Sequence, residues 1–297
     1  MRGGRRIRWP GLTLRPLGLF WVALAVLGCA GAVALQFLGP PPAPAVTRAS
    51  DAGRSASMIG VRAVPPRSHF AGAPRGTAKP GRISPGPIPP PDPALLEAAT
   101  DVPGGGMLPR IAADGRAPMS VYAHGFPPPN GAVPRVGLLV AGIGLNAGDG
   151  EDAARMLPGA VTFAVSPYAS NLPKLLDLAR ATEHECVVSV PMEPADYPAD
   201  DPGPQALLRD ATPAQNGARL HWALARISGY VGATGALGAL RGERFADAAA
   251  QMDPVLRQIA ARGLIYIDPR PGAAPPAGVW GRSVDVVIDE PANRPEI

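Results

Sequence analysis

Four charged side chains follow predicted strands in the C-terminal half of the chain: Glu193, Asp268, Arg270 and Asp289. A carboxylate in such a position can act as a general base or bind a divalent metal ion. Carboxylates and a guanidinium together can also hydrogen-bond the hydroxyl groups of a sugar. An internal ion pair or a loop cap is the alternative role for each of the four, so they are candidates for a polar, sugar-sized pocket rather than assigned catalytic residues.

Other residues of chemical interest complete no familiar site. The four histidines, His69, His124, His184 and His221, show no His-x-x-x-His spacing, and we expect His184 at the surface or in a loop. The glycines of Gly142–Gly148 match a dinucleotide fingerprint poorly, because the third is one position late and no acid ends the next strand. No serine stands in a Gly-x-Ser-x-Gly elbow. We therefore expect no bound cofactor.

Predicted strands and helices alternate from Pro134 onward. Residues 136–141 (VGLLVA) form a continuous apolar run, typical of a strand buried on both faces. The alternation predicts an α/β fold with a parallel sheet or barrel, whose chemistry lies in the loops after the strands. The remaining predicted strands are 160–165, 186–190, 230–233, 264–267 and 284–288, and the predicted helices are 151–156, 171–180, 213–227 and 244–262.

The N-terminal part has a different composition. Most of the 39 prolines precede Pro134, and residues 39–133 are rich in Pro, Gly and Ala. Such a segment cannot bury enough apolar area to offset its chain entropy, so we predict a disordered linker over 39–133. A helical turn at 92–100 and docking of 115–122 on the folded domain are alternatives within it.

Residues 17–38 form an uncharged run of 22 residues, long enough to cross a bilayer as a signal anchor. Five arginines and no acid lie in residues 1–16, which predicts that this end stays cytoplasmic and that the domain is periplasmic. We expect a single-pass protein of a bacterial inner membrane. A cleaved signal peptide and lipoprotein-type processing at Cys29 remain open.

Charge and cysteine usage agree with export. Residues 1–133 carry 14 Lys and Arg against 5 Asp and Glu, and the remainder carry 14 against 19. The positive charge is spread thinly and has no interleaved aromatic residues, so we expect no nucleic-acid partner. Cys29 and Cys186 lie in segments that cannot meet, so no internal disulfide is expected.

The segment Val190–Pro204 (VPMEPADYPADDPGP) resembles the signature loop of the divergent polysaccharide deacetylase family. The resemblance covers about residues 134–297 and implies a distorted (β/α) barrel of the polysaccharide deacetylase type. Members of that family usually continue beyond the region of Asp289, so we expect an incomplete, C-terminally truncated barrel. Further matches are Leu157–Thr162, Ser166–Leu172, Arg262–Arg270 and Asp285–Glu290.

The resemblance also implies metal chemistry, in which Asp and His hold a divalent ion such as zinc and a carboxylate is the base. At the corresponding positions this chain has Ala141, Gly142, Ser189 and Ala236. Alanine and glycine offer no ligand atom, and a single serine hydroxyl is a poor one. We therefore expect the family metal to be lost and the domain to be catalytically degenerate.

Three hypotheses about function follow. The first is a membrane-anchored envelope protein, a pseudoenzyme that binds a cell-wall glycan or an envelope protein. The second is an active carbohydrate deacetylase with a non-standard site built from Glu193, Asp268 and Asp289. The third is a structural scaffold of an envelope assembly.

Overall fold

The computed structural model describes residues 87–125, 135–236 and 238–289. The predicted anchor at 17–38, the cytoplasmic residues 1–16 and the part of the linker before residue 87 lie outside these ranges. In the ranges that are described, no helix is both long and apolar enough to cross a membrane.

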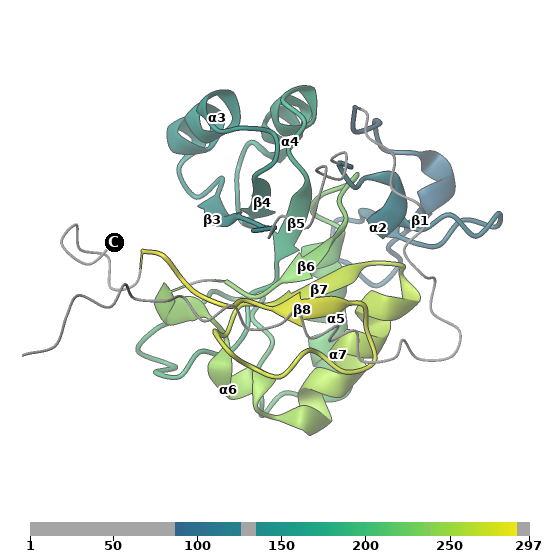
Figure 1. The fold of residues 1–297 in the computed structure, drawn as a ribbon. Coiled ribbons are helices and arrows are strands. Elements are labelled where there is room, and N and C mark those ends of the chain that lie inside the picture. The colour runs from purple at the N-terminus through teal and green to yellow at the C-terminus, as the bar shows by residue number, and fades with distance from the viewer. Residues whose placement is uncertain (1–86, 126–134, 237, 290–297) are drawn as a thin grey trace, which may run out of the picture. The chain divides into compact units, whose positions relative to one another are not determined.

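A six-stranded parallel sheet forms the centre of the fold, with its strands in chain order, β3-β4-β5-β6-β7-β8 (Figure 1). The described residues show no pairing between the first and last of these strands, so the arrangement corresponds to a partial barrel. The strands are β3 (Leu139–Ile143), β4 (Thr162–Val165), β5 (Cys186–Ser189), β6 (Gly232–Thr234), β7 (Ile265–Asp268) and β8 (Gly281–Ser283).

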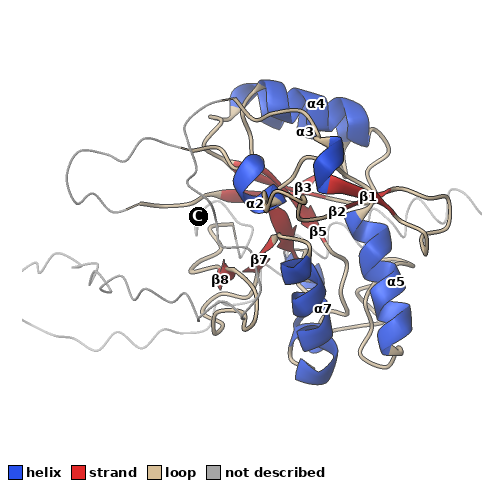
Figure 2. Ribbon diagram, turned by 90° about the vertical axis from the view of Figure 1, so that its right-hand side faces the viewer, coloured by secondary structure: helices blue, strands red, loops and turns tan. Residues whose placement is uncertain are grey.

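Helices connect these strands (Figure 2), and two of those described begin at side-chain caps. The Asn146 side chain accepts hydrogen bonds from the first turn of α3, and Thr212 forms a capping box with Gln215 at the start of α5. The helix predicted over 244–262 is two helices, because Ala248 leaves the helical conformation with a ψ of 79°. The helices are α3 (Ala147–Met156), α4 (Leu172–Ala181), α5 (Pro213–Leu224), α6 (Glu243–Ala246) and α7 (Ala249–Ala261).

Alternate residues of the strands face two different layers, as the pleat of a sheet requires. Val188, Ala233 and Tyr266 pack in the larger core, together with apolar residues of α4, α5 and α7. Ala164 and Val187 face the other way, into a smaller cluster that we call the inner-face cluster. The central strands are therefore buried on both faces, as their apolar sequences predict.

Residues 87–125 supply the cover on the inner face. Ile88, Leu95, Ala112 and Tyr122 are buried in the inner-face cluster. This segment contains a 3₁₀ turn (Pro93–Leu95), the antiparallel pair β1 (Leu96–Ala98) and β2 (Met107–Pro109), and helix α2 (Pro118–Val121). It is drawn in blue in Figure 1.

The prediction of a disordered linker is therefore wrong for residues 87–125, although docking was considered for 115–122. The buried residues of this segment follow neither helical nor strand periodicity, so the sequence pattern does not reveal them. Each fills a position that only the folded domain provides.

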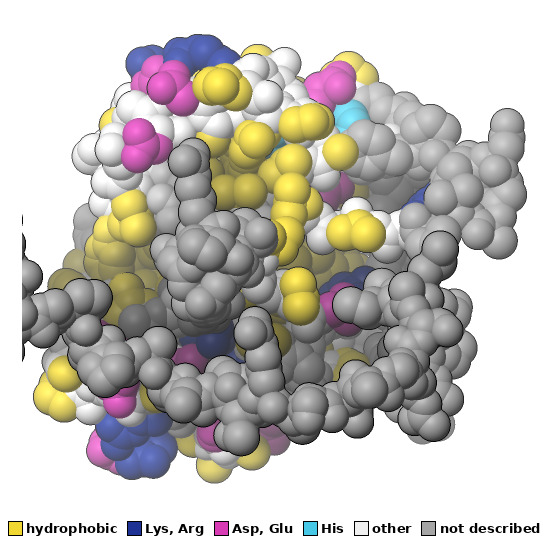
Figure 3. All heavy atoms as spheres, turned by 60° about the vertical axis from the view of Figure 1, so that its left-hand side comes forward, with side chains coloured by type: hydrophobic (Ala, Val, Ile, Leu, Met, Phe, Trp, Pro, Cys, Tyr) yellow, Lys and Arg dark blue, Asp and Glu magenta, His cyan; other side chains and the backbone are white. Residues whose placement is uncertain are grey.

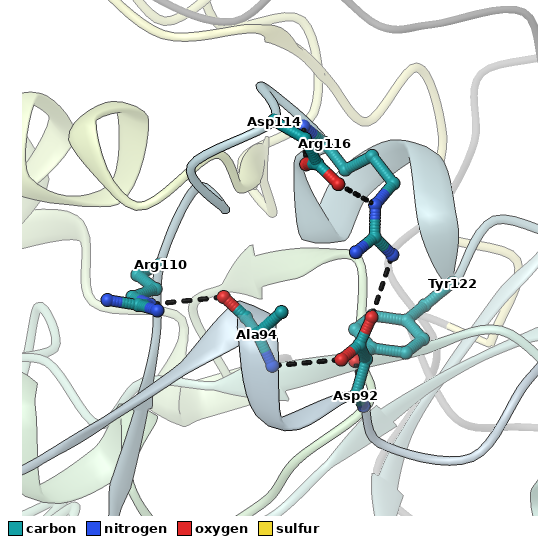
Figure 4. A network of polar contacts seen from close by, with 6 residues as sticks. All are labelled: Asp92, Ala94, Arg110, Asp114, Arg116 and Tyr122. Atoms are coloured by element: carbon teal, nitrogen blue, oxygen red, sulfur yellow. Dashed lines mark hydrogen bonds and ion pairs between the residues drawn. The ribbon is translucent and has the colours of Figure 1, made fainter.

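Polar contacts join this segment to the domain and to itself. The Arg262 guanidinium donates to Glu97 Oε1 at 2.8 Å and to the Pro109 carbonyl at 3.0 Å, while the His221 ring contacts Asp101 at 2.5 Å. Within the segment, Arg116 lies between Asp92 and Asp114, with 2.7 Å to a carboxylate oxygen of each (Figure 4). Since Arg262 and Gly263 precede β7, the segment lies at the amino ends of the strands, where the Met119 N–H donates to the Gly263 carbonyl.

The two ends of the sheet correct the sequence predictions. The strand predicted at 136–141 begins at Leu139, and Val136 is 91 % exposed, because β3 is an edge strand. Among the described residues, no strand forms over the predicted range 284–288. The last strand in these ranges is β8, and Val286 and Ile288 are exposed. Figure 3, which brings the side of the molecule bearing β3 forward, shows hydrophobic side chains on that surface.

The docked segment predicts a specific stability effect. Leu95 is fully buried, so Leu95→Ala should lower the free energy of unfolding by about 2–5 kcal/mol in urea denaturation. Val136→Ala, at an exposed apolar position, is the control and should change it by less than about 0.5 kcal/mol. Equal effects of the two substitutions would contradict docking.

The docking should also depend on pH. Burial disfavours the charged form of Asp101, but the hydrogen bond and charge of His221 outweigh it, so the pKa of this carboxyl lies below its ordinary 3.8. The hydrogen bond from Arg116 is the largest cause of the lowered pKa of Asp92 and of Asp114. A carboxylate whose pKa is lowered by folding stabilises the folded state at pH values above its ordinary pKa. This contribution is lost as the pH falls from the ordinary pKa toward the pKa in the folded state.

Hydrogen exchange measured from pH 5 downward should therefore show the amides of 87–125 losing protection below 3.8 before those of β5 do. The Asp101→Asn variant should show a smaller change with pH. If the segment and β5 lose protection together, these carboxylates do not control docking.

Candidate functional site

The candidate residues lie in the loops that follow the carboxyl ends of β5, β7 and β8. Glu193 is four residues beyond β5, Asp268 ends β7, and Arg270 follows it. In a parallel sheet these ends share one edge, where ligands of α/β proteins usually bind. The structure thus places these candidates at the carboxyl edge of the sheet, and their contacts decide what each can do.

Glu193 is buried, with 3 % of its surface exposed, and both carboxylate oxygens have partners. One oxygen accepts the Arg209 backbone N–H at 2.7 Å, and the other lies 3.2 Å from Nε of Arg244 in α6. The Arg244 guanidinium also donates to the Tyr197 carbonyl at 3.0 Å. Glu193 therefore fixes a guanidinium that is itself about one third exposed.

This pair lies in an open depression of about 450 Å³. Its wall combines apolar surface with a donor and acceptors, a combination that suits a small polar ligand with apolar faces. The residues that line it are Glu193, Tyr197, Pro198, Leu208, Asp210, Ala211 and Arg244.

Asp268 is buried and accepts three hydrogen bonds from Arg270. The guanidinium donates to both carboxylate oxygens, at 3.0 and 2.8 Å, and the Arg270 backbone N–H adds a third hydrogen bond of 3.0 Å. Arg270 also reaches Asp247, next to α6, at 2.5 Å. The hydrogen bond with Asp268 is the main cause of the raised pKa of Arg270, which remains charged. This arrangement is an internal ion pair.

The four candidates do not form one pocket. Only Glu193 lines the depression, while Asp268 and Arg270 bind each other, and Asp289 is exposed. Among the described residues, no group of three or more His, Cys, Asp and Glu side chains could hold a metal ion. The hypothesis of a non-standard site built from Glu193, Asp268 and Asp289 thus finds no geometric support in these ranges.

The positions where the resemblance implies metal chemistry carry no suitable ligand set. Ala141 packs against the inner-face cluster, and Gly142 has a φ of +75°, a conformation that favours glycine. Ser189 is buried, and Ala236 lies in the loop after β6. One hydroxyl among methyl groups and a glycine does not fit a divalent ion, so these four positions support no catalytic step through a metal.

Two contacts of the candidate residues could not be read from the sequence. Arg244 is far from Glu193 in sequence, as Asp247 is from Arg270, and the position of α6 brings each pair together. The expectation for His184 was wrong: it is 1 % exposed, with its ring nitrogens 2.8 Å from the Val161 carbonyl and 3.3 Å from the Ala154 carbonyl. Backbone acceptors therefore accommodate this polar ring in the core.

Comparisons with known proteins agree with this architecture. A family described as divergent polysaccharide deacetylase matches residues 138–297. The crystal structure of the uncharacterized protein ATU2773 from Agrobacterium tumefaciens C58 is similar, with 32 % identity and a TM-score of 0.56, over 62 % of this chain and 75 % of that one. The structural match covers more than residues 138–297 and so extends into the residues before them. None of the curated proteins matches this chain.

The ion pair of Asp268 predicts unequal effects of two similar substitutions. Asp268→Asn leaves the Arg270 guanidinium without its buried partner and should cost about 3 kcal/mol in urea unfolding. Asp247→Asn removes an exposed partner of the same guanidinium and should cost less than about 1 kcal/mol. An unchanged free energy of unfolding in Asp268→Asn would contradict a stabilising role of this ion pair.

Proposed function

Since the chain belongs to the divergent polysaccharide deacetylase family, we propose that its domain binds a cell-envelope glycan without carrying out metal-dependent hydrolysis. The observation that carries the proposal is the Glu193–Arg244 pair in the depression beside the carboxyl ends of the strands. A preserved scaffold with a polar depression and a poor metal-ligand set favours binding over catalysis.

The chemistry of the depression suits a carbohydrate. Glu193 has no free oxygen because both accept protein partners, and it holds Arg244 in place as a donor. Asp210 is highly exposed and can accept hydrogen bonds from ligand hydroxyls. Tyr197, Pro198 and Leu208 offer apolar surface for the C–H face of a sugar ring.

Location is part of the proposal. The uncharged run at 17–38, preceded by five arginines, would hold the protein in a bacterial inner membrane with its domain in the periplasm. Cell-wall glycan is then the polymer within reach. A binding experiment distinguishes glycan binding from two alternatives. In one, an envelope protein binds at the same depression, and in the other the domain is a scaffold that binds no glycan.

The test measures binding of chitohexaose and of peptidoglycan fragments to the full-length protein by calorimetry. Arg244→Ala should weaken binding about tenfold, as expected when a charged hydrogen-bond donor is lost. Arg155→Ala, an exposed arginine of α3, is the matched control and should bind like the wild type. Because Arg244→Ala leaves Glu193 without a counter-charge, Arg244→Lys is measured as well and should lose less.

Metal content and turnover provide the second arm. The purified protein should contain less than stoichiometric zinc and release no acetate from either glycan. Stoichiometric zinc with turnover would contradict the pseudoenzyme and favour an active deacetylase. Absence of glycan binding, with a protein recovered by crosslinking in cells, would favour the scaffold instead.

A further inference from the structure

A row of buried hydroxyl groups crosses the inner face of the sheet at the carboxyl ends of β4, β5 and β6. Ser189 pairs in register with Thr234, and Ser166 directly follows Val165, the residue paired with Val188. The three hydroxyl-bearing residues therefore lie at the same level on neighbouring strands. Ser166 and Ser189 are each 7 % exposed, and Thr234 is fully buried.

Two of these hydroxyls have partners and one does not. Thr234 Oγ1 donates to the Ile267 carbonyl at 2.8 Å, and Ser166 Oγ accepts the Tyr168 N–H at 3.3 Å. Ser189 Oγ is buried and has no hydrogen-bond partner among the described residues. A buried polar group without a partner costs free energy, so its presence calls for an explanation.

We propose that Ser189 is a ligand-binding residue, whose hydroxyl hydrogen-bonds an uncharged group of the glycan, a hydroxyl or an amide. The inference rests on the proposed function and adds to it a second contact, at the carboxyl ends of the strands. Ser189 is four residues before Glu193, so their Cα atoms lie within about 14 Å of each other, a length that an extended oligosaccharide covers.

The surroundings of Ser189 favour a neutral group. Its paired neighbours continue as Thr234 and then Ile267, neither of which is charged. The adjacent Asp268 is one residue further along β7, so its side chain points to the opposite face, where Arg270 holds it. An ammonium or carboxylate at Ser189 would thus be desolvated without a counter-charge from these residues, which is unfavourable.

Tyr266 provides a matched control within the same sheet. Its hydroxyl is also buried and also has no hydrogen-bond partner among the described residues. Tyr266 pairs with Ala233 and faces the larger core with α5 and α7, on the side opposite to Ser189. Removal of either hydroxyl leaves no hydrogen-bond partner behind, and only Ser189 lies in the proposed subsite.

The experiment compares Ser189→Ala and Tyr266→Phe with the wild type in the full-length protein. Both variants should melt at the wild-type temperature or above it, because neither loses a protein hydrogen bond. Ser189→Ala should bind chitohexaose about tenfold more weakly, the ratio expected for one hydrogen bond, and Tyr266→Phe should bind it normally.

Three hexasaccharides identify the group that is recognised. Chitohexaose offers amides and hydroxyls, cellohexaose offers hydroxyls only, and the fully deacetylated glucosamine hexamer offers ammonium groups. Tighter binding of chitohexaose than of cellohexaose assigns the contact to the amide, and equal binding assigns it to a hydroxyl. The glucosamine hexamer should bind most weakly.

The possible failures are distinct. If the wild type binds chitohexaose and Ser189→Ala binds it equally well, the role of Ser189 is refuted while glycan binding stands. Equal or tighter binding of the glucosamine hexamer refutes the neutral subsite. If no hexasaccharide binds to the wild type, both the proposed function and this inference are overturned.

Discussion

A parallel sheet of apolar strands must be covered on both faces, and the rest of this structure depends on that constraint. Helices α4, α5 and α7 cover one face, as their sequence alternation with the strands requires. The other face of a closed barrel would be filled by its own side chains, but the described strands do not close. Residues 87–125 fill that space, so they belong to the folded domain as much as the helices do.

Burial explains which elements the sequence could predict. Strands β4 to β7 are short apolar runs with helices between them, and their positions were predicted to within about two residues. The errors lie at the edges of the sheet, where Val136 and Val286 are apolar but exposed, so apolar character no longer reports burial. Residues 87–125 have too few periodic positions for any pattern to reveal their docking.

The candidate site shows the same division. Strand order and loop position were enough to place Glu193 and Asp268 at the carboxyl edge of the sheet. They could not show that Glu193 pairs with Arg244 of α6, or that Arg270, which binds Asp268, also reaches Asp247. The unpartnered hydroxyl of Ser189 was equally hidden, since only the packing of neighbouring strands shows which hydroxyls have found a partner.

The N-terminal segment and the proposed binding site lie at opposite ends of the strands. Pro91 packs beside Gly229, just before β6, so this part of the segment lies at the amino ends of the strands. The depression and Ser189 lie at the opposite, carboxyl edge. A polysaccharide bound at that edge, as proposed, would therefore lie across the length of the strands from Pro91 and its neighbours.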